Sequence, residues 1–452
     1  MLFHSTNLQS SPLSFAQALL FGQAPDRGLY LPESVPRLSD HEIRRFGRME
    51  YHKMAAVLLG RFMGDEIPRD VLAAMTKDAY NFDIPLENVK QRQFIMRLDQ
   101  GPTASFKDFA ARMMGRLMNY YLKRDNKRLL ILTATSGDTG SAISHAFLGM
   151  DRIKVVVLFP KDEVTNRQRK QMTTLGQNIN VLALDGKFDD CQAIVKQAFA
   201  DPLLRQFGLS SANSINIGRL IPQMVYYFYA WSRLAKDNEK ITFSVPSGNF
   251  GNMMGGVLAM QMGLPVEKFV IAVNGNDEFP QFLKSGRYNK IEPSRNCLSS
   301  AMNVGHPSNL ARLVAMYGGS MDEKGILNKQ ADLQAMQNNI WSTSVSDELT
   351  RLTIRETWEN HHVLLEPHGA VGWAGLQNYL QTQAGDVSEK LCVSLETAHP
   401  AKFPEEIIKL LGFDPALPLS LEGIENREEH FGSIPTHYES FRDYLMKNYE
   451  PR

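Results

Sequence analysis

Two loops of the sequence combine small residues and polar side chains in a way that suits anion binding. The first, PSGNFGN at residues 246–252, contains Gly248 and Gly251, and the second, TSGDTG at residues 135–140, carries three hydroxyl groups and two glycines. A loop that leads into a helix presents backbone N–H groups and the positive end of the helix dipole, which suits a phosphate in the first loop and a carboxylate in the second. The first loop matches neither GxxxxGK[ST] nor GxGxxG, which argues against ATP and dinucleotide binding. A tight turn and an N-cap cluster without any ligand are the alternative interpretations.

Two further segments offer a nucleophile and a group that transfers protons. In GPTASFKDFA, Ser105 and Asp108 have capping-box-like spacing, which predicts that Lys107 lies in the first turn of a helix. The helix dipole disfavours an ammonium there, and this suits a Schiff-base nucleophile; an exposed, solvated lysine is the alternative. In ETAHPAKF, Thr397 is able to bond a heterocycle nitrogen and His399 is able to act as an acid or base, with ordinary loop capping as the alternative.

The elements around these loops alternate between strands and helices. Short apolar runs predict buried strands at 128–132, 155–159, 241–245, 269–273 and 391–395. Continuous apolar strands separated by helices indicate parallel sheets covered on both faces, and right-handed crossovers would stack them into a doubly wound α/β architecture. Ligands of such sheets lie outside the carboxyl ends of the strands, where the loops at 135, 246 and 396 stand.

The remaining segments are less regular. The first ninety or so residues have mostly helical patterns, with a capping box from Ser14 to Gln17 opening a short helix and further helices at 51–63 and 68–80. A turn-rich stretch at 304–309 is followed by a long polar pattern that we interpret as helical.

Composition excludes several classes of protein. The chain has 452 residues, and its 49 Lys and Arg balance its 49 Asp and Glu, so we expect no nucleic-acid partner. Its three cysteines lie far apart and form no CxxC pair, so we expect no metal site and a reducing compartment. No apolar run approaches the ~20 residues that span a bilayer, and no secretory signal is visible, so we expect a cytoplasmic protein without a membrane partner.

Six segments in one order point to a known family. They are GPTASFKDFA, TATSGDTGSA, SANSINIGRL, VPSGNFGN, EPHGAVGWAG and ETAHPAKF. Together they resemble the threonine synthases, which are fold-type II, tryptophan synthase β-like enzymes that depend on pyridoxal 5′-phosphate (PLP). The resemblance implies a helical N-terminal region at 1–91 and two doubly wound parallel-sheet lobes at 92–215 and 216–452. We expect the lobes to exchange chain segments, so these boundaries are approximate.

The resemblance also implies a role for each loop. Lys107 matches the Schiff-base lysine, Asp138 the residue near the phenolic oxygen of the cofactor, and Thr397 the partner of its pyridine nitrogen. The phosphate of the cofactor is assigned to Gly248, Asn249, Phe250, Gly251 and Asn252, where some members have an acidic residue in place of Asn252. The substrate carboxylate is assigned to Ser136, Gly137 and Thr139. A neutral Thr397 is expected to leave the ring nitrogen less protonated.

The implied reaction converts O-phospho-L-homoserine and water to L-threonine and phosphate, by γ-elimination followed by hydration at Cβ. This reaction needs a second phosphate site, for which Arg219 is the first choice; Lys161, the basic stretch 167–170 and Lys402 are the other candidates. Two alternatives stay open: another fold-type II enzyme such as a serine or threonine dehydratase or a β-replacement enzyme, and a catalytically silent PLP-binding relative. We expect a monomer or a homodimer.

Overall fold

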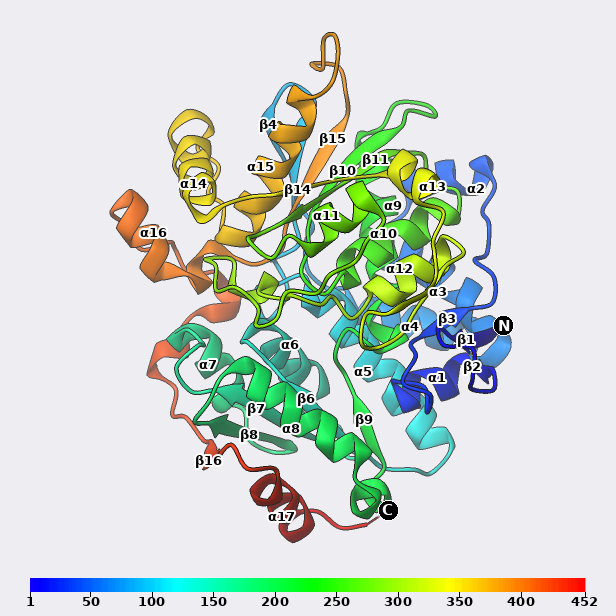
Figure 1. The fold of residues 1–452 in the computed structure, drawn as a ribbon, viewed down its shortest axis with the longest axis vertical. Helices are drawn as coiled ribbons and strands as arrows, with labels where there is room; N and C mark the ends of the chain where they lie inside the picture. Colours follow the sequence, from blue (N-terminus) through cyan, green and yellow to red (C-terminus); the bar gives the residue numbers. More distant parts are fainter. Residues whose placement is uncertain (452) are drawn as a thin grey trace.

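A computed structural model describes residues 1–451 and contains two large sheets of mostly parallel strands, one above the other in Figure 1. The larger sheet has the strand order β14-β11-β10-β15-β5-β4, and all its neighbouring strands are parallel except β4 and β5. Its strands are β4 (Leu86–Lys90), β5 (Gln93–Arg97), β10 (Ile241–Pro246), β11 (Val266–Val273), β14 (Ile340–Ser344) and β15 (Cys392–Glu396).

The smaller sheet is parallel throughout and has the order β16-β8-β7-β6-β9. Its strands are β6 (Leu129–Ala134), β7 (Ile153–Pro160), β8 (Ile179–Leu184), β9 (Leu209–Ser211) and β16 (Gly432–Ile434). Every residue of β6 is buried, as is every residue of β10 in the larger sheet. Burial on both faces explains why β6, LLILTA, is an almost continuous apolar run, whereas β10, ITFSVP, also buries the polar residues Thr242 and Ser244.

Helices cover the sheets and begin at the loops that follow the strands. Those after the N-terminal region are α5 (Lys107–Arg124), α6 (Asp138–Phe147), α7 (Asn166–Thr173), α8 (Phe188–Ala200), α9 (Met224–Leu234), α10 (Gly251–Gln261), α11 (Glu278–Ser285), α12 (Leu310–Met316), α13 (Leu333–Asn339), α14 (Asp347–His361), α15 (Pro367–Gln381), α16 (Pro404–Leu411) and α17 (Tyr438–Asn448). Helices α6, α10 and α15 stand directly before or after the strands whose loops the sequence singles out.

The N-terminal region packs at one side of the molecule (Figure 1). It contains β1 (Leu2–Ser5), β2 (Leu13–Ser14), β3 (Tyr30–Pro32), α1 (Phe15–Phe21), α2 (Asp40–Arg45), α3 (Tyr51–Met63) and α4 (Arg69–Ala79). The capping box predicted from Ser14 to Gln17 is confirmed, and α1 ends at Gly22. Tyr51 of α3 packs edge-on against Phe109 of α5, with their ring centroids 5.6 Å apart. The region therefore supports the helix that carries Lys107.

Chain segments cross between the two sheets. Strand β5, which precedes α5, pairs with β15 of the larger sheet, whereas β16 near the C-terminus pairs with β8 of the smaller sheet. In Figure 1 the segment after α16 runs down the left side of the molecule to β16 and α17. Both sheets therefore contain strands from either side of the boundary expected at 215, and the larger sheet also contains strands from either side of that at 91.

Most predicted elements are confirmed within a few residues, but two predictions are wrong. Ser105 does not cap α5: the N-cap is Phe106, and Asp108 instead accepts from Thr103 N at 2.8 Å and from Thr103 Oγ1 at 2.7 Å. The polar pattern after 309 is not one long helix, because the edge strand β14 and the short strands β12 (Ser320–Met321) and β13 (Leu327–Lys329) interrupt it. An edge strand has one free side, so its polar residues give no buried-strand signal.

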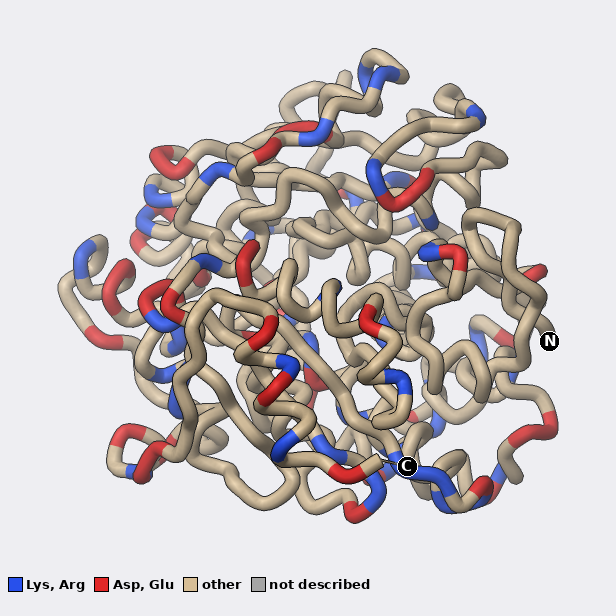
Figure 2. The backbone as a smooth tube through the Cα atoms, turned by 60° about the horizontal axis from the view of Figure 1, so that its bottom comes forward, with Lys and Arg blue, Asp and Glu red and all other residues tan. Residues whose placement is uncertain are grey.

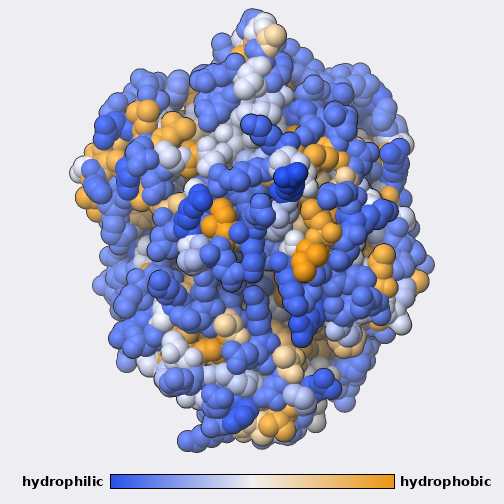
Figure 3. Space-filling model, in the orientation of Figure 1, coloured by the Kyte–Doolittle hydropathy of each residue, from blue (hydrophilic) through white to orange (hydrophobic). Residues whose placement is uncertain are grey.

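None of the helices within residues 1–451 is both long and apolar enough to span a membrane. The face drawn in Figure 3 is mostly hydrophilic, and its apolar residues form small separate spots.

Candidate active site

A cavity of about 690 Å³ opens between the two sheets at the carboxyl ends of their strands. The loops after β6, β10 and β15 all contribute to its lining, together with the start of α5. Its size is that of a site for a small molecule. Of the candidate residues, those that line it are Lys107, Ser136, Asp138, Thr139, Arg219, Gly248, Asn249, Phe250, Gly251, Asn252 and Thr397. The structure therefore brings together loops that are up to 290 residues apart (107 to 397).

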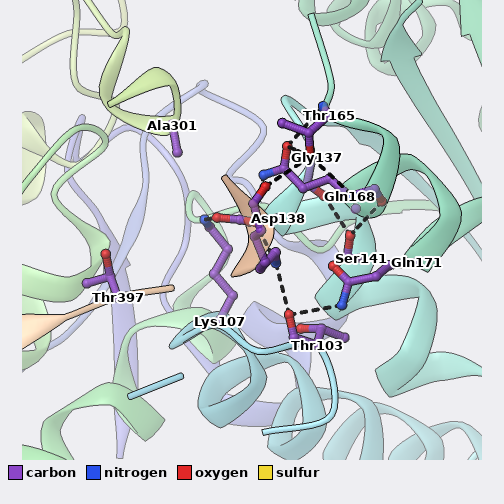
Figure 4. Close-up of polar contacts among 12 residues, drawn as sticks. Thr103, Lys107, Gly137, Asp138, Ser141, Thr165, Gln168, Gln171, Ala301 and Thr397 are labelled. Atoms are coloured by element: carbon purple, nitrogen blue, oxygen red, sulfur yellow. Dashed lines mark hydrogen bonds and ion pairs between the residues drawn. The ribbon is translucent and has the colours of Figure 1, made fainter. Parts of the chain in front are cut away.

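Lys107 is the first residue of α5, and its side chain is only 12% exposed. Its Nζ lies 3.3 Å from Asp138 Oδ2, and Figure 4 shows the side chain lying between Asp138 and Thr397. Burial lowers the pKa of Lys107, the charge of Asp138 opposes this, and the cations Lys402 and Arg219 lower it further. A buried lysine with a lowered pKa is a better nucleophile because more of it is the free amine.

Asp138 stands at the start of α6 and holds two ammonium groups. Its Oδ1 lies 2.6 Å from Lys402 Nζ and accepts from Gln168 Nε2 at 2.9 Å, while Oδ2 contacts Lys107. Burial alone would raise the pKa of Asp138, but Lys402 and Lys107 outweigh it and hold the pKa well below its usual value. The carboxylate is therefore a fixed negative charge beside the Lys107 amine.

Lys402 is not available to bind a substrate phosphate, contrary to one of the sequence interpretations. It is completely buried, and its Nζ donates to Thr103 O at 2.9 Å besides pairing with Asp138. It lies outside the set of residues that line the cavity. Its positive charge instead lowers the pKa of Lys107, which contacts the same carboxylate.

The loop between β10 and α10 presents the N-terminus of an eleven-residue helix to the cavity. The first N–H groups of a helix have no carbonyl within their own helix, so they are free to hold an anion. A Cβ at Gly248 would lie 2.9 Å from Met302 Cα, so a glycine is needed for this close approach. Asn252 Oδ1 accepts from Tyr226 Oη at 2.6 Å and from Tyr227 Oη at 2.7 Å, which fixes its amide at the start of α10.

The loop between β6 and α6 turns sharply at Gly137, whose φ of 123° is unfavourable for other residues. Thr135 Oγ1 accepts from Gly137 N at 2.9 Å and from Gly140 N at 2.8 Å, and this holds the turn. Ser136 and Thr139 line the cavity, whereas Gly137 lies in the same turn but outside the set of lining residues. The hydroxyl groups on either side of Asp138 are thus the ones that reach the cavity.

Thr397 follows β15 and lies across the cavity from Asp138 (Figure 4). Its main-chain oxygen accepts from Phe106 N at 2.9 Å, which ties it to the start of α5, and its Oγ1 lies 3.3 Å from Glu366 Oε1. His399 does not reach the cavity: its ring accepts from Ala401 N, and burial lowers its pKa to about 4. His399 is therefore a cap, as the alternative interpretation has it.

Arg219 lies in the segment between β9 and α9 and is 3% exposed. Its Nη1 donates to Ala212 O at 2.7 Å, and burial lowers its pKa to about 10. Asn213 and Ser214 line the cavity beside it, and neither is among the site residues predicted from the sequence. Their segment, SANSINIGRL, is one of the six that resemble the family, so the sequence indicates that the segment matters but does not indicate which of its residues line the cavity.

The basic stretch at 167–170 binds the C-terminal part of the chain rather than an anion. Arg167 donates to Asp414 Oδ1 at 2.9 Å and to Glu425 Oε1 at 2.8 Å, and Arg169 donates to Glu429. These charges are already paired, so the sequence interpretation of the stretch as a phosphate site loses its basis. Lys161 is exposed and lies outside the cavity lining.

The cavity fits PLP on three observations. A buried amine with a lowered pKa suits the aldehyde, and the N-terminus of α10 suits the phosphate. Within residues 1–451, three buried polar atoms of lining residues have no hydrogen-bond partner: Asn213 Oδ1, Arg219 Nε and Asn252 Nδ2. Buried polar atoms are normally paired, so these three indicate that a polar ligand belongs in the cavity.

Comparison with known proteins agrees with the site. The family model described as pyridoxal-phosphate dependent enzyme matches residues 83–397, that of the threonine synthase N terminus residues 2–80, and that of the threonine synthase C-terminal part residues 369–445. The chain is 37% identical to a threonine synthase of Haemophilus influenzae, covering 96% of this chain and 97% of that one. It is 36% identical to that of Escherichia coli, covering 99% and 100%.

Solved structures give the same result. A PLP-bound threonine synthase from Brucella melitensis matches with a TM-score of 0.92 and 34% identity, covering 99% of both chains. This chain therefore belongs to the threonine synthase family of PLP-dependent enzymes and has their fold-type II architecture.

Proposed function

We propose that the chain converts O-phospho-L-homoserine and water to L-threonine and phosphate, with PLP as its cofactor. The observation that carries this proposal is one cavity that joins a buried lysine amine, the N-terminus of a helix and a second buried cation, Arg219. The reaction needs a nucleophilic amine and separate places for the phosphates of cofactor and substrate. Membership of the threonine synthase family supports the same reaction.

Lys107 is the residue to which the cofactor would attach, with its phosphate at residues 248–252 and its ring between Asp138 and Thr397. Bound there, PLP supplies an aldehyde carbon and a conjugated ring that withdraws electrons from the bonds at the α-carbon of the substrate. Lys107 Nζ is the base that removes and returns protons at the substrate carbons, and its lowered pKa keeps more of the amine free at a given pH. Asp138 keeps this amine in place through its contact of 3.3 Å.

The substrate is held by two groups of residues in this proposal. Ser136 and Thr139, with the turn at Gly137, take its carboxylate, since they stand at the start of α6 and line the cavity. Arg219 takes its phosphate, because a guanidinium binds phosphate with paired hydrogen bonds and its Nε has no other partner within residues 1–451. Asn213 and Ser214 border the same position.

The decisive experiment measures phosphate release from O-phospho-L-homoserine by the wild type and by Lys107→Ala, with threonine identified as the product. The wild type is expected to release phosphate and form threonine in equal amounts, and Lys107→Ala is expected to lose at least about three orders of magnitude in rate. An assay with serine tests the alternative of a dehydratase. Formation of a keto acid from serine, without phosphate release from phosphohomoserine, would contradict our proposal and favour the dehydratase. Borohydride reduction followed by peptide mapping tests the alternative of a catalytically silent relative. Absence of a pyridoxyl group on Lys107 would remove the catalytic assignment of this residue.

The proposal also includes the binding partners of the chain, its assembly and its division into structural units. Basic and acidic residues are interspersed over the chain in Figure 2, which supports the expectation of no nucleic-acid partner. The expected assembly is a monomer or a homodimer. The units at 1–91, 92–215 and 216–452 remain our approximate division; the larger sheet takes β4 and β5, and the smaller sheet takes β16, from across a boundary.

A further inference from the structure

Arg312 of α12 is completely buried and donates hydrogen bonds to three separate parts of the chain. Its Nε donates to Tyr30 O of β3 at 3.0 Å. Its Nη1 donates to Ser214 O at 3.2 Å, and its Nη2 donates to Ile215 O at 2.7 Å. A second bond from Nη1, of 2.6 Å, goes to Asn309 Oδ1. One guanidinium therefore joins the N-terminal region, the segment between β9 and α9, and the start of α12.

The acceptors of Arg312 are all neutral oxygens of the main chain or of an amide. Burial lowers the pKa of Arg312 to about 9, and no acid within residues 1–451 counteracts this effect. The guanidinium is still charged at neutral pH, and hydrogen bonds from an ion are stronger than those between neutral groups. Because a buried ion needs every one of its hydrogen bonds, the oxygens that accept from Arg312 are held firmly in place.

Asn309 extends this network to the loop before α10. It is completely buried, and its Nδ2 donates to Asn249 O at 2.8 Å and to Ser214 O at 3.2 Å. Asn249 belongs to the loop proposed for the cofactor phosphate, whereas Ser214 borders the place proposed for the substrate phosphate. Figure 1 shows α12 next to α10 and to the N-terminal strands. The amide of Asn309, itself held by Arg312, thus joins the walls of the two phosphate sites.

A short turn connects the held carbonyl groups to Arg219. Asn216 comes directly after the held segment; its side chain accepts from Gly218 N at 2.9 Å, and its main-chain oxygen accepts from Arg219 N at 3.0 Å. Its Nδ2 donates to Leu19 O of α1 at 2.9 Å. The N-terminal region therefore supports the turn of Arg219 from both β3 and α1.

We infer that Arg312 is a positioning residue: through its own hydrogen bonds and through Asn309 it sets the place of Arg219 relative to the loop at 248–252. It thereby fixes the separation between the substrate phosphate and the cofactor, and it favours substrates of the length of O-phospho-L-homoserine. The inference rests on the proposed function, because it takes Arg219 as the residue that binds the substrate phosphate. The N-terminal region, whose β3 and α1 hold the same segment, then takes part in substrate recognition.

The test compares two ligands of the holoenzyme at saturating PLP. One is the phosphonate in which a CH₂ group replaces the ester oxygen of O-phospho-L-homoserine, and the other is L-norvaline, the same amino acid without its phosphonate group. The absorbance change of the bound cofactor gives the Kd of each, and the wild type is expected to bind the phosphonate more tightly. In Arg312→Met, the Kd of the phosphonate is expected to rise at least about tenfold, because Arg219 is misplaced, while that of L-norvaline stays unchanged.

Arg312→Lys distinguishes the position of the hydrogen bonds from the charge. The ammonium keeps the positive charge, but it is a point charge on a flexible chain and lacks the planar fork that spans the three segments. This variant is expected to bind the phosphonate as weakly as Arg312→Met does. Wild-type affinity in Arg312→Lys would overturn the inference, because the charge alone would then be enough.

Asn309→Leu decides the matter if Arg312→Met does not fold. Leucine has the branching of asparagine without its hydrogen-bonding groups, so this variant removes the bond to Asn249 O and adds no charge. It is expected to raise the Kd of the phosphonate and to leave that of L-norvaline unchanged. A phosphonate affinity that stays at the wild-type value in either variant that folds, or an equal loss for both ligands, would contradict the inference.

Arg233→Met is the matched control, because Arg233 also ties the N-terminal region to a later helix through main-chain oxygens. It donates to Gly47 O at 2.7 Å and to Phe46 O at 3.3 Å, and it lies outside the cavity lining. Both Kd values are expected to stay at their wild-type values. The wild type itself separates this inference from the proposed function: if it binds the phosphonate no more tightly than L-norvaline, the proposed substrate phosphate site is wrong, and not only the role of Arg312.

Discussion

Asp138 connects two lysines that differ in their surroundings. Lys107 lines the cavity, whereas Lys402 is completely buried and also donates to a backbone carbonyl. A buried ion pair costs desolvation energy for both partners, so it is stable only with further hydrogen bonds, which Gln168 and Thr103 O provide here. The amine of Lys107 contacts only Asp138, whereas the amine of Lys402 contacts both Asp138 and Thr103 O.

Replacing Lys402 tests this arrangement. Lys402→Met is expected to lower the free energy of unfolding by about 3–5 kcal/mol, because it leaves Asp138 buried with one cation fewer. Removal of the Lys402 charge also raises the pKa of Lys107, so reductive labelling of Lys107 is expected to need a higher pH. Urea unfolding and the pH dependence of labelling are the two measurements.

Lys240→Met serves as the control, since Lys240 pairs with Glu267 at 3.5 Å and both side chains are at least half exposed. It is expected to change the unfolding free energy by less than about 1 kcal/mol. Equal effects of the two substitutions would show that Lys402 has no special place in the structure.

The loop that precedes helix α10 has a tightly restricted conformation. Phe250 adopts a φ of 62° and Gly248 approaches the segment around Met302, so the loop has little freedom to take other side chains. The segment that it approaches includes Ala301, whose N–H donates to His368. The proposed phosphate loop thus contacts a segment that is in turn hydrogen-bonded to α15.

Gly248→Ala is expected to weaken PLP binding while the chain stays folded. The new Cβ would lie 2.9 Å from Met302 Cα and 3.1 Å from Ala301 O, so backbone must move. Such overpacking costs about 1–3 kcal/mol, which corresponds to roughly fivefold to 150-fold in Kd. Titration of the apoprotein with PLP, followed by absorbance, measures it.

Gly60→Ala is the matched control, because a Cβ at Gly60 in α3 meets only Leu72 Cδ2 at 3.6 Å. It is expected to leave the PLP affinity unchanged and to stabilise the helix by about 0.5–1 kcal/mol. An unchanged Kd in Gly248→Ala would contradict the assignment of this loop to the cofactor phosphate.

The two sheets are held together by segments that leave one and enter the other. The C-terminal part runs from α16 to β16 along the outside of α7 (Figure 1), where Arg167 binds Asp414 and Glu425 and also donates to Ala401 O at 2.8 Å. This segment follows directly on the loop with Thr397 and Lys402. Its attachment therefore fixes one wall of the cavity to the smaller sheet.

Arg167→Met is expected to loosen this attachment. The arginine is 7% exposed while its acidic partners are about half exposed, so the expected loss of stability is about 2 kcal/mol. Limited proteolysis is expected to cut faster within residues 412–437. Arg442→Met, which removes only a pair with the adjacent Asp443, is expected to cut at the wild-type rate, and equal cutting of both variants would refute the role of Arg167.

The sequence was enough to predict the strands, the glycine loops, the capping box of α1 and the family, because each of these depends on residues that are close together in the chain. It did not predict that Ser105 leaves α5 uncapped, that β14 interrupts the polar segment, or that Arg167 binds the C-terminal part. Nor did it predict that Lys402 turns inward to Asp138, or that Glu366 stands behind Thr397. These features depend on pairs that folding brings together from distant parts of the chain, such as 138 with 402, and on burial, which sets the charge of each group. The spacing of nearby residues predicts neither the long-range pairs nor the burial.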